Sequence, residues 1–228
     1  MNLNNYAREC GVLNAEVGNI KQWVWPQKDT QTFNIIVHDW FQGIRPILQE
    51  FFPDGGRTVI QAGGNCGVYP LLYTEFFNNV YTFEPDPLSF FCLVNNCQMP
   101  GISKFNCALG EQFSTVVMDE LIPENRGMNK VRNAEDSKYS IPVLPLDSFN
   151  VNNIDLIQLD LEGYEDKALL GATNTINNNR PIIIVESAAN SDPAAYSIVL
   201  KILEGFNYTP HKQITRLDTV FLPAEKQP

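Results

Sequence analysis

Acidic side chains stand at the ends of two strongly apolar segments in the second half of the chain. The run Ile154–Asp160 ends in one carboxylate, Glu162 follows two residues later, and the run Pro181–Glu186 ends in a third. The carboxyl ends of parallel strands meet at one edge of a sheet, so we expect these side chains to lie close together. Mutual repulsion would then raise the pKa of at least one of them towards that of a useful general base, or would favour a hard cation. Asp160 and Glu162 are therefore the predicted catalytic residues.

A second group of residues predicts a ligand-binding turn nearer the N-terminus. The apolar run Thr58–Ala62 breaks directly into Gly63, Gly64 and Gly67. Glycines adopt positive φ and carry no Cβ, so a bulky polar ligand can lie against bare backbone where the next helix begins. About one strand–helix unit downstream, Glu84 ends an apolar segment, at the position where a carboxylate holds a ribose diol. Together the two elements predict an adenosine-containing ligand.

The composition and the same turn argue against several other classes of ligand. The turn lacks the G-x-x-x-x-G-K-[ST] phosphate loop, and Asn65 stands where a dinucleotide fingerprint requires glycine. The net charge of −10, with no basic cluster, gives no complement to a nucleic-acid backbone. Five cysteines without C-x-x-C pairing suit reduced thiols, and no segment approaches the ~20 apolar residues of a membrane span. We therefore expect a cytoplasmic protein that binds neither nucleic acid nor membrane.

Helical and strand patterns alternate along most of the chain. In order, they are a helix over Trp40–Phe52, a strand over Thr58–Ala62, a helix over Val68–Phe77, a strand over Val80–Phe83, a helix over Leu88–Cys97, an edge strand over Lys104–Ala108, a strand over Ile154–Asp160, a helix over Asp166–Gly171, a strand over Pro181–Glu186 and a last strand over Thr219–Leu222. This alternation predicts an α/β fold with a doubly wound, mostly parallel sheet. The polar stretch Met118–Tyr139 is predicted to be a loop, residues 1–32 an N-terminal extension or cap, and residues 33–228 a single domain.

Six motifs lie in a fixed order between the first strand and the second acidic strand end. They are Gln61–Gly67, Phe83–Pro85, Cys107–Gly110, Leu146–Asp147, Gln158–Glu165 and Ile183–Glu186. Taken together, they resemble the FkbM-type methyltransferases, which are class I S-adenosylmethionine-dependent enzymes and in many cases O-methyltransferases. The resemblance implies a Rossmann-like fold, with helices on both faces of a seven-stranded sheet and an antiparallel C-terminal strand.

The resemblance also implies which residues hold S-adenosylmethionine. Gly63, Asn65 and Gly67 are expected to face its methionine part, Glu84 its ribose hydroxyls, and Cys107 and Ala108 its adenine, with Gln61 and Asp160 completing the cofactor-binding set. The family usually places an acidic residue where this chain has Gln61. An amide there still accepts a hydrogen bond from the cofactor's amino group, but without the assistance of a charge.

A magnesium site is a further expectation by analogy. In catechol-type O-methyltransferases, carboxylates at corresponding strand ends hold Mg²⁺, which suggests Asp160 and Glu186 as ligands here, with Asn190 as a third. The alternative is that these carboxylates bind water, substrate or a helix N-terminus without metal. Glu162 and Glu165 have a structural alternative as well, since acidic residues favour the start of the helix that follows them.

The expected function is S-adenosylmethionine-dependent methylation, with the hydroxyl of a sugar or small metabolite as the acceptor. The first alternative is a catalytically degenerate cofactor-binding or scaffold protein with the same fold, motivated by Gln61. The second is an enzyme that uses a nucleotide sugar or nicotinamide cofactor. The sequence does not identify the acceptor, and it leaves open whether the chain forms a homo-oligomer.

Overall fold

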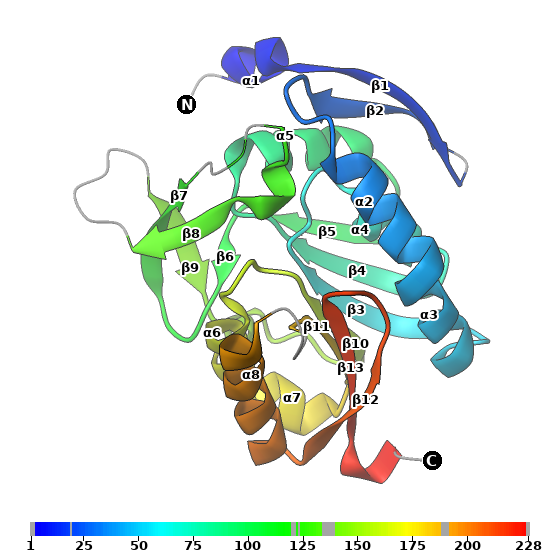
Figure 1. The fold of residues 1–228 in the computed structure, drawn as a ribbon, viewed down its shortest axis with the longest axis vertical. Helices are drawn as coiled ribbons and strands as arrows, with labels where there is room; N and C mark the ends of the chain where they lie inside the picture. Colours follow the sequence, from blue (N-terminus) through cyan, green and yellow to red (C-terminus); the bar gives the residue numbers. More distant parts are fainter. Residues whose placement is uncertain are drawn as a thin grey trace.

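The computed structural model describes residues 3–18, 20–119, 122, 124–133, 140–187 and 192–226. A seven-stranded sheet forms the centre of the molecule, with helices on both of its faces and two smaller sheets at its periphery (Figure 1). Among the described helices, none combines the length and the apolar character that crossing a membrane requires.

The central sheet has the strand order β12-β13-β11-β10-β3-β4-β5. Its strands are β3 (Gly56–Ala62), β4 (Phe77–Phe83), β5 (Ile102–Phe105), β10 (Ile154–Leu159), β11 (Ile182–Glu186), β12 (Tyr208–Gln213) and β13 (Asp218–Pro223). All neighbouring pairs from β5 to β11 are parallel, whereas β13 runs antiparallel to both β11 and β12. The predicted Rossmann-like architecture with an antiparallel C-terminal strand is confirmed. The chain reverses its direction of winding between β3 and β10, which is where sheets of this kind bind ligands.

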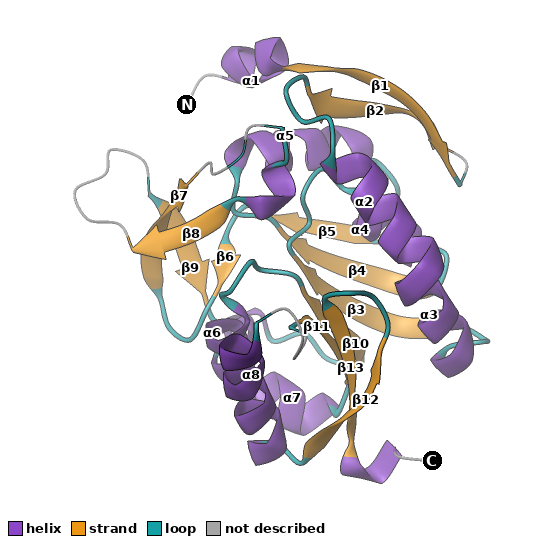
Figure 2. Ribbon diagram, viewed as in Figure 1, coloured by secondary structure: helices purple, strands orange, loops and turns teal. Residues whose placement is uncertain are grey.

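Most of the helices fall into two groups, one on each face of the sheet, and the first helix lies beside the N-terminal hairpin (Figure 2). Their bounds are α1 (Leu3–Glu9), α2 (Thr32–Asp39), α3 (Arg45–Phe51), α4 (Val68–Tyr73), α5 (Pro87–Asn96), α6 (Glu165–Leu170), α7 (Thr173–Asn179) and α8 (Pro193–Gly205). A π-helical turn over Trp40–Ile44 joins α2 to α3. Residues of α2 to α5 share one hydrophobic core cluster, and residues of α6 to α8 share the other. The sheet is therefore buried on both faces, which explains the unbroken apolar character of β11.

An N-terminal hairpin packs against α5 at the edge of the molecule. It consists of β1 (Cys10–Val17) and β2 (Ile20–Pro26), paired antiparallel. The side-chain amide of Asn96, at the end of α5, exchanges two hydrogen bonds with the backbone of Val24 and donates a third to the carbonyl oxygen of Cys66, at 2.7 Å. A single amide thus connects the hairpin to the turn that follows β3. We retain the proposal that residues 1–32 form a cap on the main domain.

A four-stranded sheet includes part of the stretch Met118–Tyr139, which the sequence predicted to be a loop. Its order is β6-β9-β7-β8, with β6 (Ala108–Leu109), β7 (Ser114–Asp119), β8 (Lys130–Asn133) and β9 (Ile141–Leu144). The prediction was wrong for β8, because its polar side chains concealed an edge strand that pairs antiparallel with β7. Pairing with a neighbouring strand satisfies the backbone of such a segment without requiring apolar side chains.

Other boundaries also differ from the sequence-based prediction. The helix predicted from residue 68 ends at Tyr73, and Phe77 already belongs to β4. The single helix predicted from residue 40 is divided into the π-helical turn and α3. The sequence analysis did not predict α7, α8 or β12, whose buried faces are narrow.

Candidate active site

A cavity of about 270 Å³ opens at the carboxyl ends of the parallel strands, beside the neighbouring ends of β3 and β10. Among the predicted site residues, the cavity is lined by Gly63, Asn65, Glu84, Cys107, Ala108, Asp160, Glu162 and Glu186. The fold therefore brings together residues that are more than 120 positions apart in the sequence. Gln61 and Gly67 are the two predicted cofactor residues that do not line the cavity.

The turn after β3 depends on glycine at both of its ends. Gly63 has φ +91°, and a Cβ at this position would overlap the backbone carbonyl of Asp160. Gly67 has φ +96° and immediately precedes α4, where a Cβ would stand 2.6 Å from the Sγ atom of Cys97. Such contacts are too short for real Cβ atoms, so the turn packs closely against two other segments.

Gln61 supports this turn through a hydrogen bond to its backbone. Its side chain is fully buried, and its Nε2 atom donates a hydrogen bond to the carbonyl oxygen of Gly63 at 2.9 Å. Its Oε1 atom accepts a hydrogen bond from the Thr82 hydroxyl at 2.6 Å. A carboxylate at this position would have no proton to donate to Gly63. The amide therefore suits its buried surroundings, and it supports the glycine turn without lining the cavity.

Glu84 links the end of β4 to the glycine turn. Its Oε2 atom accepts a hydrogen bond from the backbone N–H of Asn65, and its Oε1 atom accepts one from that of Asp86, each at 2.7 Å. The side chain is buried yet lines the cavity. Burial, reinforced by the nearby carboxylate of Asp86, raises the pKa of Glu84 to about 8. Glu84 thus holds both loops while presenting a carboxyl group to the cavity.

A segment between β7 and β8 closes the same side of the cavity. Arg126 forms an ion pair with Asp86, and the side-chain amide of Asn129 donates to the same carboxylate at 2.9 Å. The backbone N–H of Arg126 also donates to the side chain of Asp29, at 3.2 Å. Residues 124–129, which the sequence analysis assigned only to a polar loop, thereby connect the N-terminal segment to α5. Their signal in the sequence was weak, because isolated polar residues are normal in a loop.

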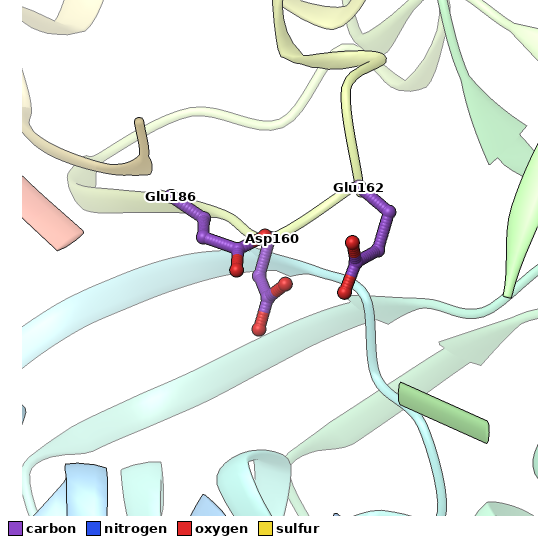
Figure 3. A group of neighbouring side chains, drawn as sticks. All are labelled: Asp160, Glu162 and Glu186. Atoms are coloured by element: carbon purple, nitrogen blue, oxygen red, sulfur yellow. The ribbon is translucent and has the colours of Figure 1, made fainter. Parts of the chain in front are cut away.

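The three predicted carboxylates converge from two strand ends (Figure 3). One oxygen each of Asp160, Glu162 and Glu186 lies within 4.8 Å of the others. Burial raises the pKa of Asp160 and of Glu186, and the two neighbouring carboxyl groups influence each other's titration. This pair therefore keeps a proton at a higher pH than isolated carboxylic acids would. The expected clustering at one edge of the sheet is present.

Glu162 is held on a strained turn. It has φ +54°, a left-handed conformation that is uncommon for a residue with a Cβ. The side chain of Glu165, at the start of α6, accepts hydrogen bonds from the backbone N–H groups of Leu161 at 2.8 Å and Gly163 at 3.2 Å. Glu165 thus stabilises the turn that carries Glu162, in line with its structural alternative. Burial raises the pKa of Glu162, while Lys130 opposes this shift.

Sequence reasoning missed several residues that line the cavity. Besides Arg126 and Asn129, they include Asp39, Tyr69 and Asp218. Tyr69 lies in the apolar first turn of α4, a pattern that predicts a core residue. Asp218 immediately precedes the predicted last strand. Asn190, the suggested third metal ligand, lies outside the described residues.

Comparison with known proteins places the chain in a family. Residues 65–210 match the model of the methyltransferase FkbM domain, which covers well over half of the chain. No curated protein matches the sequence significantly. The FkbM methyltransferase of Methylobacillus flagellatus KT is 20% identical, with a TM-score of 0.49 over 73% of this chain and 43% of that one. The chain belongs to the FkbM methyltransferase domain family.

Two other solved structures are similar to the chain at low identity. Trm5b from Pyrococcus abyssi has a TM-score of 0.51 at 10% identity, covering 92% of this chain and 54% of its own. Magnesium protoporphyrin IX methyltransferase from Synechocystis PCC 6803, determined with bound S-adenosylmethionine, has a TM-score of 0.46 at 10% identity, covering 86% and 85%. The chain thus spans about half the length of the Methylobacillus and Pyrococcus proteins, and the likeness to Trm5b shows the fold alone.

Proposed function

We propose that this protein transfers a methyl group from S-adenosylmethionine to a hydroxyl of a sugar or other small metabolite. The observation that carries the proposal is one cavity shared by the glycine turn and Glu84 on one side and by Asp160 and Glu162 on the other. Family membership supports methyl transfer as the reaction. The acceptor is inferred from the chemistry of the cavity.

The residues of the cavity suit the cofactor by shape and by hydrogen bonding. Gly63 and Gly64 line the cavity, and as glycines they present only backbone atoms to a ligand. Glu84 presents a carboxyl group suited to a ribose diol, and Cys107 and Ala108 offer small side chains on the adenine side. When bound, S-adenosylmethionine supplies a methyl group activated by a sulfonium centre.

The chain's own contribution to the reaction is positioning and removal of one proton. Glu162 is the proposed general base, because its strained turn aims it into the cavity and its pKa is raised towards a useful range. Asp160 orients the reactants beside the glycine turn. Asp160 and Glu186 remain the proposed ligands of Mg²⁺, since their oxygens and that of Glu162 have the close spacing that a divalent cation requires.

The reaction is tested with methyl-deuterated S-adenosylmethionine and a panel of sugars and sugar derivatives, with and without Mg²⁺. Mass spectrometry should find a deuteromethyl ether on one class of acceptor, at a rate that falls strongly in Glu162→Gln. If the cofactor binds but no acceptor in the panel is methylated, the non-catalytic cofactor-binding alternative gains support. A rate that does not change with added Mg²⁺ or with a chelator contradicts the metal proposal.

A further inference from the structure

Three residues at one end of the cavity have no part in the proposed methyl transfer. Asp39 ends α2, Tyr69 lies in α4 and Asp218 begins β13, and all three line the cavity. They are close enough to interact electrostatically, since the charges of Asp218, Asp160 and Asp39 act on Tyr69, and the charge of Asp39 acts on Asp218. They therefore form a second polar group beside the three carboxylates, which we call the Asp39–Tyr69–Asp218 group.

Asp218 extends the row of carboxylates across the sheet. It lies directly opposite Glu186 in the antiparallel pairing of β11 with β13. Like charges at paired positions destabilise a sheet unless a ligand or a proton compensates them. Asp218 is 6% exposed, and its Oδ2 atom accepts a hydrogen bond from the Thr215 hydroxyl at 2.6 Å. That neutral partner leaves the negative charge of Asp218 uncompensated.

Tyr69 supplies an unused polar atom in the same place. It is 5% exposed and lines the cavity, yet its hydroxyl has no hydrogen-bond partner anywhere in the described part of the chain. A hydroxyl that faces a cavity without a protein partner is available to hydrogen-bond a ligand atom or water. Burial, followed by the charge of Asp218, raises the pKa of Tyr69, so the hydroxyl stays neutral.

The chain's own cations do not neutralise this group. Arg216 is exposed at the rim of the cavity and forms no ion pair with any described residue. Arg126 is already paired with Asp86. The side chain of Asp39 contacts the ring of His38, which is 72% exposed and carries charge only when protonated.

We propose that the Asp39–Tyr69–Asp218 group binds the protonated amine of an amino sugar whose hydroxyl is the methyl acceptor. An ammonium group has three hydrogens to donate, and this group offers two carboxylates and one hydroxyl oxygen as acceptors. A cation also relieves the cost of keeping carboxylates buried, whereas a phosphate or carboxylate on the acceptor would increase it. This inference rests on the proposed methyl transfer and specifies its substrate class.

The test measures sugar binding in a protein already saturated with S-adenosylhomocysteine. Saturation is confirmed first by calorimetry, so a failure of the cofactor site is recognised separately. Glucosamine, N-acetylglucosamine and glucose 6-phosphate are then titrated at neutral pH. We expect the dissociation constant of glucosamine to be lower than that of N-acetylglucosamine by about tenfold or more, because acetylation removes the positive charge of the amine. Glucose 6-phosphate is expected to bind most weakly.

Variants test which residues of the cavity cause the preference for glucosamine. Asp218→Asn keeps a hydrogen-bond acceptor for Thr215, and Asp39→Asn changes a less buried side chain, so a folding defect in one does not remove the test. Each should abolish most of the preference for glucosamine, and Tyr69→Phe should reduce it. Glu50→Gln, an exposed site on α3 with the same change of charge, is the matched control and should retain it. Equal or tighter binding of the acetylated or phosphorylated sugar, or no binding of glucosamine, overturns the proposal.

Discussion

The backbone carbonyl of Asp160 occupies the space next to Gly63 that a Cβ on that glycine would need. This contact joins the turn after β3 to the turn after β10, and so holds the two halves of the candidate site together. Replacing Gly63 with alanine forces one of the two turns to move, and the positive φ of Gly63 adds strain. We expect Gly63→Ala to bind S-adenosylhomocysteine at least tenfold more weakly by calorimetry. Gly205→Ala is the control, because a Cβ there meets no atom within 4 Å.

Glu84 is expected to contribute cofactor affinity through a hydrogen bond between its carboxyl group and the ribose of the cofactor. Glu84→Ala should weaken the binding of S-adenosylhomocysteine by about 1–3 kcal/mol, measured by calorimetry. The substitution also leaves the N–H groups of Asn65 and Asp86 without their carboxylate, so thermal unfolding should shift to lower temperature. Glu84→Gln, which keeps one acceptor oxygen, should fall between the two. Unchanged affinity in Glu84→Ala would show that the ribose lies elsewhere.

The family usually has an acidic residue at the position of Gln61, yet we expect an acidic residue to be unfavourable in this chain. Gln61→Glu should destabilise the protein and weaken cofactor binding, because a carboxylate cannot donate to the carbonyl of Gly63 and is fully buried. The expected loss of unfolding free energy is about 1–3 kcal/mol, measured by denaturant titration. If the glutamate variant binds the cofactor more tightly at equal stability, direct contact between residue 61 and the cofactor is the better account.

The raised pKa of Glu162 predicts a specific pH dependence of turnover. Its pKa is raised by burial, and a base is active only when ionised, so activity should be lost as the pH falls through that raised pKa. The acidic limb of the kcat profile should therefore lie above the pKa of an ordinary glutamic acid, as an apparent value of the carboxylate cluster. Glu162→Gln should lower kcat by about 10²-fold or more while leaving S-adenosylhomocysteine affinity nearly unchanged. An unaltered profile in this variant would assign the base to another residue.

Asp160 should affect turnover more than binding. Asp160→Asn keeps the shape of the side chain and the carbonyl that contacts Gly63, but removes its negative charge from the cavity. We expect a fall in kcat of about 10²-fold with a smaller change in cofactor affinity. Parallel calorimetry and initial-rate measurements would check this. Equal losses of affinity and kcat would place Asp160 in cofactor binding alone.

The sequence predicted the parts of this fold that strong local patterns encode. The glycine turn after β3 and the apolar strands β10 and β11 follow from side-chain chemistry alone, and parallel pairing then brings Asp160 and Glu186 to one edge. The prediction failed for β8, where strand pairing outweighs a polar sequence.

Contacts between distant segments account for the rest of the site. The carboxylate of Asp147 accepts hydrogen bonds from the backbone N–H groups of Asn174 at 2.9 Å and Thr175 at 2.8 Å, in α7. The ion pair of Arg126 with Asp86 also depends on tertiary structure, and so does the strand register that places Asp218 opposite Glu186. A single sequence carries no local signal for such partners.

Calorimetric titration with S-adenosylhomocysteine tests the central claim most directly. The account predicts one binding site per chain with micromolar affinity, weakened in Glu84→Ala and in Gly63→Ala. Repeating the titration with Mg²⁺ shows whether the carboxylates at the strand ends also take up a cation. An absence of binding in both buffers, by a folded protein, would contradict the assignment of this cavity as a methyltransferase cofactor site.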